Sequence, residues 1–365
     1  MRKKLNLIID QTSWTDAEAQ YRKVCPFSTS QTTTFDFLEA LLWAGSTGIS
    51  LQMPQWWLAS QWAILRYFGA ADHSTNRLRL HRAAADMETH SKAVLSDDWG
   101  VGISLQWLSR RLRYKEVAHG RFAMNEFIRS GLAQHPTKGR RKRGPHKCPD
   151  FFAIDSQNNV HIIECKGNQQ GPRQTETQFV RGLDQKSNVK FKHEPMVGQR
   201  LRSGVAIAGM DASWNSTLQI ADPPPGSDDD GESKETSYFI NVDNVKAIRP
   251  SMSKVSLIQG LLLAGAYNEA HKAFPRETDP GNEIVQAVGD GQSFHASGLR
   301  WKGRIQEALY PVPVRLVDET SIVGCRLRFG ASSELLEMLG GDRLESLLAS
   351  DDLAISYKEN RFDVT

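Results

Sequence analysis

Two acids and a lysine stand close together in the segment KCPDFFAIDSQNNVHIIECKG, at residues 147–167. Asp150 follows a proline, and Glu164 and Lys166 end an apolar run with a single residue between them. Side chains of a β-strand alternate between its two faces, so Glu164 and Lys166 are predicted to share one face and Cys165 to occupy the other. An acid and a base that share a face at the end of an apolar strand indicate a site for chemistry.

A hairpin is predicted to bring Asp150 to the other two residues. The turn residues SQNN (156–159) separate two apolar runs, and Ser and Asn favour turns. If all four residues form the turn, Asp150 lies opposite Cys165 in the antiparallel register. We then expect Asp150 to lie within about 5–8 Å of both Glu164 and Lys166. The predicted result is two carboxylates and one ammonium group at a sheet edge.

This combination of groups suits the hydrolysis of phosphodiesters. Two neighbouring carboxylates repel each other and favour a hard divalent cation such as Mg²⁺, which leaves its other positions to water and phosphate oxygens. Such an ion polarises the phosphoryl group and activates a bound water. The lysine can orient that water, accept its proton if its pKa is lowered, or stabilise negative charge. The sequence leaves these three roles open, and Mn²⁺ is an alternative to Mg²⁺ as cofactor.

The positive charge of the chain is concentrated around this segment. Residues 101–200 contain 19 Lys and Arg against 8 Asp and Glu, whereas the rest contains 26 against 34. A basic loop, TKGRRKRGPHK (137–147), leads directly into the predicted site. We expect DNA as the partner, with phosphates contacted by Arg140, Arg141, Lys142, Arg143, Lys147 and Arg173. A nuclear localisation signal or a solvated basic face would look the same in the sequence.

The P-D at 149–150 and the E-C-K at 164–166 resemble the catalytic motif of the PD-(D/E)XK nuclease superfamily. The resemblance covers about residues 105–210. It implies an α/β fold with a restriction-endonuclease-like mixed sheet flanked by helices. It also implies a metal-dependent nuclease in which Asp150 and Glu164 bind the metal and Lys166 is catalytic.

The same resemblance implies further ligands of the metal ion. Members of the superfamily often add an acid from the helix that precedes the hairpin. Glu126, in RFAMNEFIRSGL, is our choice for that catalytic acid, and Glu116 is the second choice. A solvated helix acid is the alternative for either residue. The backbone carbonyl of Cys165 is a further metal ligand that the resemblance implies.

Four regions are expected along the chain. Residues 1–100 are predicted to form a helical N-terminal region, and residues 101–221 the nuclease core. The segment DPPPGSDDDGESKET (222–236) has the composition of a flexible acidic, proline-rich linker. Residues 237–365 are predicted to form an α+β C-terminal region.

Other features of the sequence argue against several classes of protein. No apolar run approaches the roughly 20 residues of a membrane helix, and the apolar stretch near the N-terminus is too short for a signal peptide. The four cysteines form no CxxC pair, which favours reduced thiols and a cytoplasmic location. The chain contains no GxxxxGK[ST] loop, so no nucleotide cofactor is expected.

The leading expectation is a metal-dependent DNA endonuclease that serves restriction, anti-phage defence or transposition, with a protein partner or as a homodimer. That biological setting rests on analogy with the superfamily. One alternative is a non-catalytic nucleic-acid-binding or assembly protein that retains the nuclease fold, and another is an RNA-directed nuclease. The presence of all three of Asp150, Glu164 and Lys166 favours catalysis.

Overall fold

The computed structural model of the chain describes most of the N-terminal two thirds and several later strands. The described residues are 1–9, 31–47, 63–64, 66–135, 148–186, 189–192, 197–221, 238–243, 245–263, 270–271, 274, 292–296, 299–315, 321–332 and 363–364. The basic loop at 137–147 and the predicted linker at 222–236 lie outside these residues.

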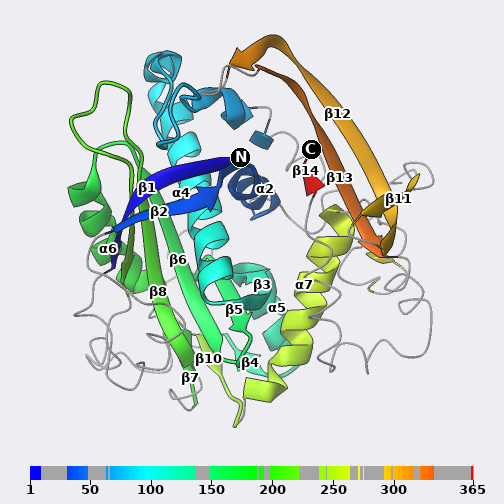
Figure 1. Cartoon of the computed structure of the whole chain (residues 1–365). Helices are drawn as coiled ribbons and strands as arrows, with labels where there is room; N and C mark the ends of the chain where they lie inside the picture. The colour runs from blue at the N-terminus through cyan, green and yellow to red at the C-terminus, as the bar shows by residue number, and fades with distance from the viewer. Residues whose placement is uncertain are drawn as a thin grey trace.

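A seven-stranded mixed sheet forms the centre of the described fold, in the order β2-β1-β9-β8-β6-β5-β3 (Figure 1). The strands are β1 (Arg2–Ile9), β2 (Gln31–Asp36), β3 (Tyr114–His119), β5 (Phe151–Asp155), β6 (Val160–Asn168), β8 (Val197–Ala206) and β9 (Thr217–Ala221). The pairs β1–β9 and β6–β8 are parallel and the other pairs are antiparallel. The α/β class and the mixed sheet are therefore confirmed.

The prediction of a helical N-terminal region is wrong for its first strands. Residues 2–9 and 31–36 form β1 and β2, and β1 pairs with β9 of the predicted nuclease core. The alternation of buried and exposed residues along β1 fits a strand that covers a core with one face. The sheet that carries the candidate motif thus includes residues from both sides of position 100.

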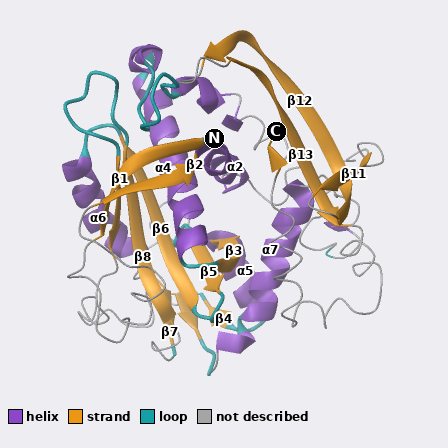
Figure 2. Ribbon diagram, in the orientation of Figure 1, coloured by secondary structure: helices purple, strands orange, loops and turns teal. Residues whose placement is uncertain are grey.

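The helices lie on both faces of the sheet (Figure 2). They are α2 (Phe37–Thr47), α4 (Thr89–Arg111), α5 (Gly120–Arg129), α6 (Pro172–Lys186) and α7 (Arg249–Leu263), with short 3₁₀ turns at Phe68–Ala70, Arg82–Asp86 and Val245–Ala247. On β8, Ser203 hydrogen-bonds to Ser104 of α4 at 2.7 Å, whereas the next residue, Gly204, lies against Thr175 of α6. Consecutive strand residues face opposite ways, so α4 and α6 cover opposite faces.

Two hydrophobic layers follow from this arrangement. One layer joins α2 and α4 to the sheet and includes Phe37, Ile103 and Ile163. The other lies under α5 and α7 and includes Phe127 and Phe152, whose rings meet edge to face at 5.5 Å between centroids. Burial of apolar surface in both layers fixes the hairpin β5–β6 from its two sides.

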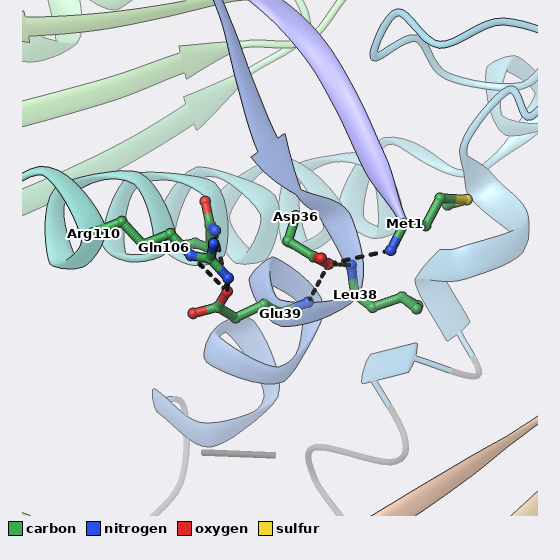
Figure 3. A network of polar contacts seen from close by, with 6 residues as sticks. All are labelled: Met1, Asp36, Leu38, Glu39, Gln106 and Arg110. Atoms are coloured by element: carbon green, nitrogen blue, oxygen red, sulfur yellow. Dashed lines mark hydrogen bonds and ion pairs between the residues drawn. The ribbon is translucent and has the colours of Figure 1, made fainter. Parts of the chain in front are cut away.

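Helix α4 is also tied by polar contacts to α2, and the start of α2 is in turn capped by the last residue of β2 (Figure 3). Asp36 accepts hydrogen bonds from the backbone amides of Leu38 (3.1 Å) and Glu39 (3.2 Å), which caps the start of α2. The Glu39 carboxylate in turn binds Gln106 and Arg110 of α4. The N-terminal segment therefore helps to position the helix that packs behind the motif strand.

Two smaller sheets complete the described fold. One, β4-β10-β7, consists of β4 (Ala133–Gln134), β7 (Val189–Phe191) and β10 (Tyr238–Ile240). The other consists of β11 (Gln292–Ala296), β12 (Leu299–Arg315), β13 (Ser321–Ser332) and β14 (Asp363–Val364). Because β10 pairs with β4 and β7, the first strand of the predicted C-terminal region joins strands that come from the predicted core. Figure 1 shows the long β12–β13 ribbon on the side of α7.

Candidate active site

The turn of the β5–β6 hairpin has one residue fewer than predicted. The backbone amide of Asn158 donates to the carbonyl of Asp155 at 3.1 Å, and the Asp155 amide donates to the carbonyl of Asn159 at 3.1 Å. Asn158 adopts φ +66°, a left-handed conformation that asparagine tolerates. These bonds close a three-residue loop, a common hairpin type with a left-handed third residue.

The shorter loop changes the strand register at the site. Phe151 pairs with Ile163, so Asp150 comes opposite Glu164 and the predicted pairing of Asp150 with Cys165 is wrong by one residue. Directly opposed residues of an antiparallel pair share a face, and a slip of one residue would move Asp150 to the other face. The observed register thus places both acids on the same face of the sheet.

The structure brings Asp150, Glu164 and Lys166 together. The Lys166 Nζ forms an ion pair with Glu164 Oε1 and lies 3.9 Å from Asp150 Oδ2. Asp150 Oδ2 also accepts a hydrogen bond from the backbone amide of Cys165 at 2.8 Å. Two carboxylates and one ammonium group therefore converge where β5 begins and β6 ends.

The burial of Glu164 and the closeness of the second carboxylate make this pair a strong attractor of positive charge. The Glu164 side chain is 1% exposed, and its Oε2 has no hydrogen-bond partner among the described residues. Burial, and then the neighbouring Asp150 carboxylate, raise the pKa of Glu164 to about 7. Burial also raises the pKa of Asp150. A buried carboxylate oxygen without a partner is costly, and a bound cation would remove that cost.

The chain matches no protein-family model, no curated protein and no solved structure. The case for a metal centre therefore rests on the donor set. Among the described residues, no group of three or more His, Cys, Asp or Glu side chains is arranged to hold a metal ion. Asp150 and Glu164 alone fit Mg²⁺, which commonly binds one or two carboxylates and keeps several waters. The unsatisfied Glu164 Oε2 is the observation that favours a cation at this place.

Lys166 is charged in this environment. Burial lowers its pKa, but the carboxylates of Asp150 and Glu164 outweigh burial and the pKa of Lys166 is raised. A lysine with a raised pKa is a poor proton acceptor near neutral pH. Of the three roles that the sequence left open, the structure favours orientation of a water and stabilisation of negative charge.

A close backbone contact holds Asp150 in place. The Gly120 amide, at the start of α5, donates to the Asp150 carbonyl at 2.7 Å. A Cβ at position 120 would collide with the carbonyl oxygen of Pro149, so the approach of α5 to this strand requires glycine. The close contact between Gly120 and Pro149 thus fixes the backbone position of Asp150.

Helix α4 makes a similar contact on the other strand of the motif. A Cβ at Gly100 would lie 2.5 Å from the carbonyl oxygen of Lys166, and one at Gly167 would collide with the Ser96 carbonyl. This contact brings Asp97, which the sequence did not single out, to the solvent-exposed edge of the site. Asp97 raises the pKa of Asp150, after burial as the main cause. No local pattern identifies Asp97, because only the packing of α4 on β6 brings it there.

The two acids predicted as additional metal ligands, Glu126 and Glu116, both contact helix α7. Glu126 forms ion pairs with Arg129 of the same helix and, at 3.1 Å, with Lys254 of α7. Glu116 accepts a hydrogen bond from Ser253 of α7 at 2.6 Å. Both acids are buried and both bind α7, so their observed contacts are those of anchors for that helix. A catalytic role for Glu126 stays a prediction.

The predicted phosphate contacts are placed only in part. Arg173, at the start of α6, is exposed. The five basic residues at 140–147 lie outside the described residues. Cys165 is a buried free cysteine between the two charged residues of β6, where the resemblance puts a carbonyl ligand. None of the described helices is both long and apolar enough to cross a membrane.

Proposed function

We propose that this protein is a metal-dependent nuclease that hydrolyses phosphodiester bonds in DNA. The observation that carries the proposal is the convergence of Asp150, Glu164 and Lys166 on one face at adjoining strand ends. The mixed sheet with helices on both faces supports the resemblance to the PD-(D/E)XK superfamily, and a restriction-endonuclease-like fold is part of the proposal.

The three side chains divide the chemistry between them. Asp150 and Glu164 would hold Mg²⁺ or Mn²⁺, which when bound polarises the scissile phosphate and lowers the pKa of a bound water. The hydrogen bond from the Cys165 amide fixes one Asp150 oxygen and leaves the other for binding. The charged Lys166 stands beside both acids, where it would orient the attacking water and stabilise negative charge on the phosphate.

The proposed setting is restriction, anti-phage defence or transposition in the cytoplasm. Local positive charge around the site supports a polyanionic substrate, because residues 101–200 carry 19 Lys and Arg against 8 Asp and Glu. This charge supports nucleic acid in general, and the preference for DNA follows from the superfamily resemblance.

Cleavage assays test the proposal directly. The purified chain is incubated with supercoiled plasmid, single-stranded DNA and RNA, each with Mg²⁺, Mn²⁺ or EDTA. Asp150→Ala and Lys166→Gln are assayed in parallel, with Asp211→Asn as the control because Asp211 is an exposed acid outside the site. We expect metal-dependent DNA cleavage by the parent and by Asp211→Asn, and none by the two site variants. Equal cleavage by the site variants would refute the assignment, and cleavage of RNA alone would refute DNA as the substrate.

A further inference from the structure

A second positively charged side chain, that of Arg121, belongs to a helix next to the candidate site that the motif does not include. Arg121 is the second residue of α5 and follows Gly120, whose amide holds the Asp150 carbonyl at 2.7 Å. Arg121 is exposed, and no ion pair joins it to any described acid. The same helix ends at Arg129, which is paired with Glu126. Arg121 therefore offers its charge to a ligand, whereas Arg129 is already neutralised.

The fold places the backbone of Arg121 close to the first acid. A Cβ at Gly120 would collide with the carbonyl oxygen of Pro149 and would lie 3.3 Å from the carbonyl carbon of Asp150, so the start of α5 touches the residues that lead into β5. Arg121 is the next residue along this helix.

The neighbouring histidine does not compete for the same role. Burial, and then the charge of Arg121, lower the pKa of His119 to about 4, so His119 is neutral near pH 7. Its ring lies against Phe122 and Phe151, with centroids at 5.0 and 5.7 Å. Of the three consecutive residues 119–121, only Arg121 carries a charge.

We infer that Arg121 binds a DNA backbone phosphate beside the one that is cleaved. The inference rests on the proposed nuclease function and adds a substrate-positioning residue to it. Arginine suits this role because its planar guanidinium donates two parallel hydrogen bonds to a phosphate. A contact from α5, which is bonded to the Asp150 backbone, would hold the substrate in register with the catalytic acid. The phosphate backbone carries no sequence information, so the contact gives affinity and register but not base specificity.

Binding measured without cleavage tests the inference. The affinity for a fluorescent DNA duplex is measured in an Asp150→Ala background, so that binding is followed without cleavage. The measurement is repeated between 50 and 300 mM KCl, because each phosphate contact releases about one counterion and therefore adds to the salt dependence of binding. Arg121→Gln is compared with Arg82→Gln, a matched neutralisation of an exposed arginine on the 82–86 turn. We expect Arg121→Gln to weaken binding on all sequences alike and to lower the salt slope by about 1. Arg82→Gln is expected to leave both quantities unchanged, and Arg121→Lys to restore part of the affinity.

The outcomes separate this inference from the function on which it rests. If the parent cleaves DNA and Arg121→Gln binds with unchanged affinity and salt slope, the Arg121 contact is refuted and the nuclease proposal stands. If the parent neither binds nor cleaves DNA under any metal condition, both are refuted. A rise in KM that exceeds the fall in kcat, for Arg121→Gln with Asp150 intact, would support substrate positioning. A loss confined to one DNA sequence would overturn a backbone contact in favour of base reading.

Discussion

The Asp150 carboxylate accepts a hydrogen bond from the Cys165 backbone amide at 2.8 Å. This bond joins the first acid of the site to the strand that carries the other two site residues. It fixes the direction of a carboxylate that stands just before β5, where the ladder pairing ends. Through this bond the Asp150 side chain adds a contact between the start of β5 and β6. Its second carboxylate oxygen is left for a cation.

Two substitutions of Asp150 should separate this structural bond from catalysis. Asparagine keeps an oxygen that can accept from the Cys165 amide but removes the charge, so Asp150→Asn should lose cleavage by at least about 10²-fold with little change in stability. Asp150→Ala should lose cleavage equally and also lose the charge-assisted bond, which contributes about 1.5–3 kcal/mol. Plasmid cleavage rates and urea unfolding check both outcomes. Greater stability of Asp150→Ala than of Asp150→Asn would contradict the role of this bond.

The stability of the metal-free protein should fall as pH rises through the titration of Glu164. Its pKa of about 7 in the folded state, against an ordinary 4.5, means that the folded state binds its proton more tightly. The stability that this proton contributes is therefore complete below about pH 4.5 and is lost as the pH rises through 7, and the loss is roughly 3 kcal/mol. Glu164→Gln cannot titrate, so in EDTA it should be more stable than the parent at pH 8 and similar at pH 4.5. The free energy of unfolding of both proteins is measured in urea across this pH range. A difference in free energy that stays constant with pH would contradict the raised pKa of Glu164.

Local patterns in the sequence predict some of these features and not others. The two strands of the hairpin, Phe151–Asp155 and Val160–Asn168, follow from the apolar runs on either side of the turn residues SQNN. The register of the hairpin does not, because it depends on the left-handed conformation of Asn158. SQNN is compatible with a loop of three residues as well as four, and the difference decides which face Asp150 occupies.

Long-range contacts account for the remaining differences. Residues 2–9 are a strand because they pair with β2 and with β9, and β9 is more than 200 positions away in the chain. Asp97 reaches the site because glycines at 100 and 167 let α4 approach β6, and no spacing in the sequence signals that contact. Glu126 resembles a candidate ligand in sequence, yet its ion-pair partner Lys254 comes from a helix beyond the predicted linker.

Removal of the Glu126 charge should affect stability more than catalysis. Glu126→Gln would leave Lys254 of α7 without its acid, in a place where the Glu126 side chain is 4% exposed. Loss of one partner of a buried ion pair costs about 3–5 kcal/mol. Glu126→Gln with Lys254→Met should recover part of that loss, because the less exposed of the two cationic partners of Glu126 then carries no charge. Thermal unfolding and plasmid cleavage per folded molecule check this. A fully folded Glu126→Gln protein without metal-dependent cleavage would instead support Glu126 as the additional catalytic acid.

Substitution of Asp97 should change the Mg²⁺ concentration that cleavage requires but not the stability of the fold. It lies at the exposed edge of the site, and its charge adds to the field of Asp150. Asp97→Asn should raise the Mg²⁺ concentration needed for half-maximal cleavage several-fold and leave thermal unfolding unchanged. The control is Asp86→Asn, which neutralises another exposed acid on the 82–86 turn. Equal Mg²⁺ dependence of both variants would remove Asp97 from the site.

A single methyl group at Gly120 should disturb the site through the backbone. The added Cβ would collide with the Pro149 carbonyl oxygen, so Gly120→Ala must push α5 away from the residue before Asp150. Overpacking of this kind costs about 1–3 kcal/mol, and the hydrogen bond from the Gly120 amide to the Asp150 carbonyl would lengthen. Gly69→Ala is the matched control, because no atom lies within 4 Å of a Cβ at that position. We expect Gly120→Ala to unfold at a lower urea concentration and to cleave more slowly at saturating Mg²⁺, while Gly69→Ala changes neither. If Gly120→Ala were as stable and active as Gly69→Ala, the close approach of α5 would not be what positions the first acid.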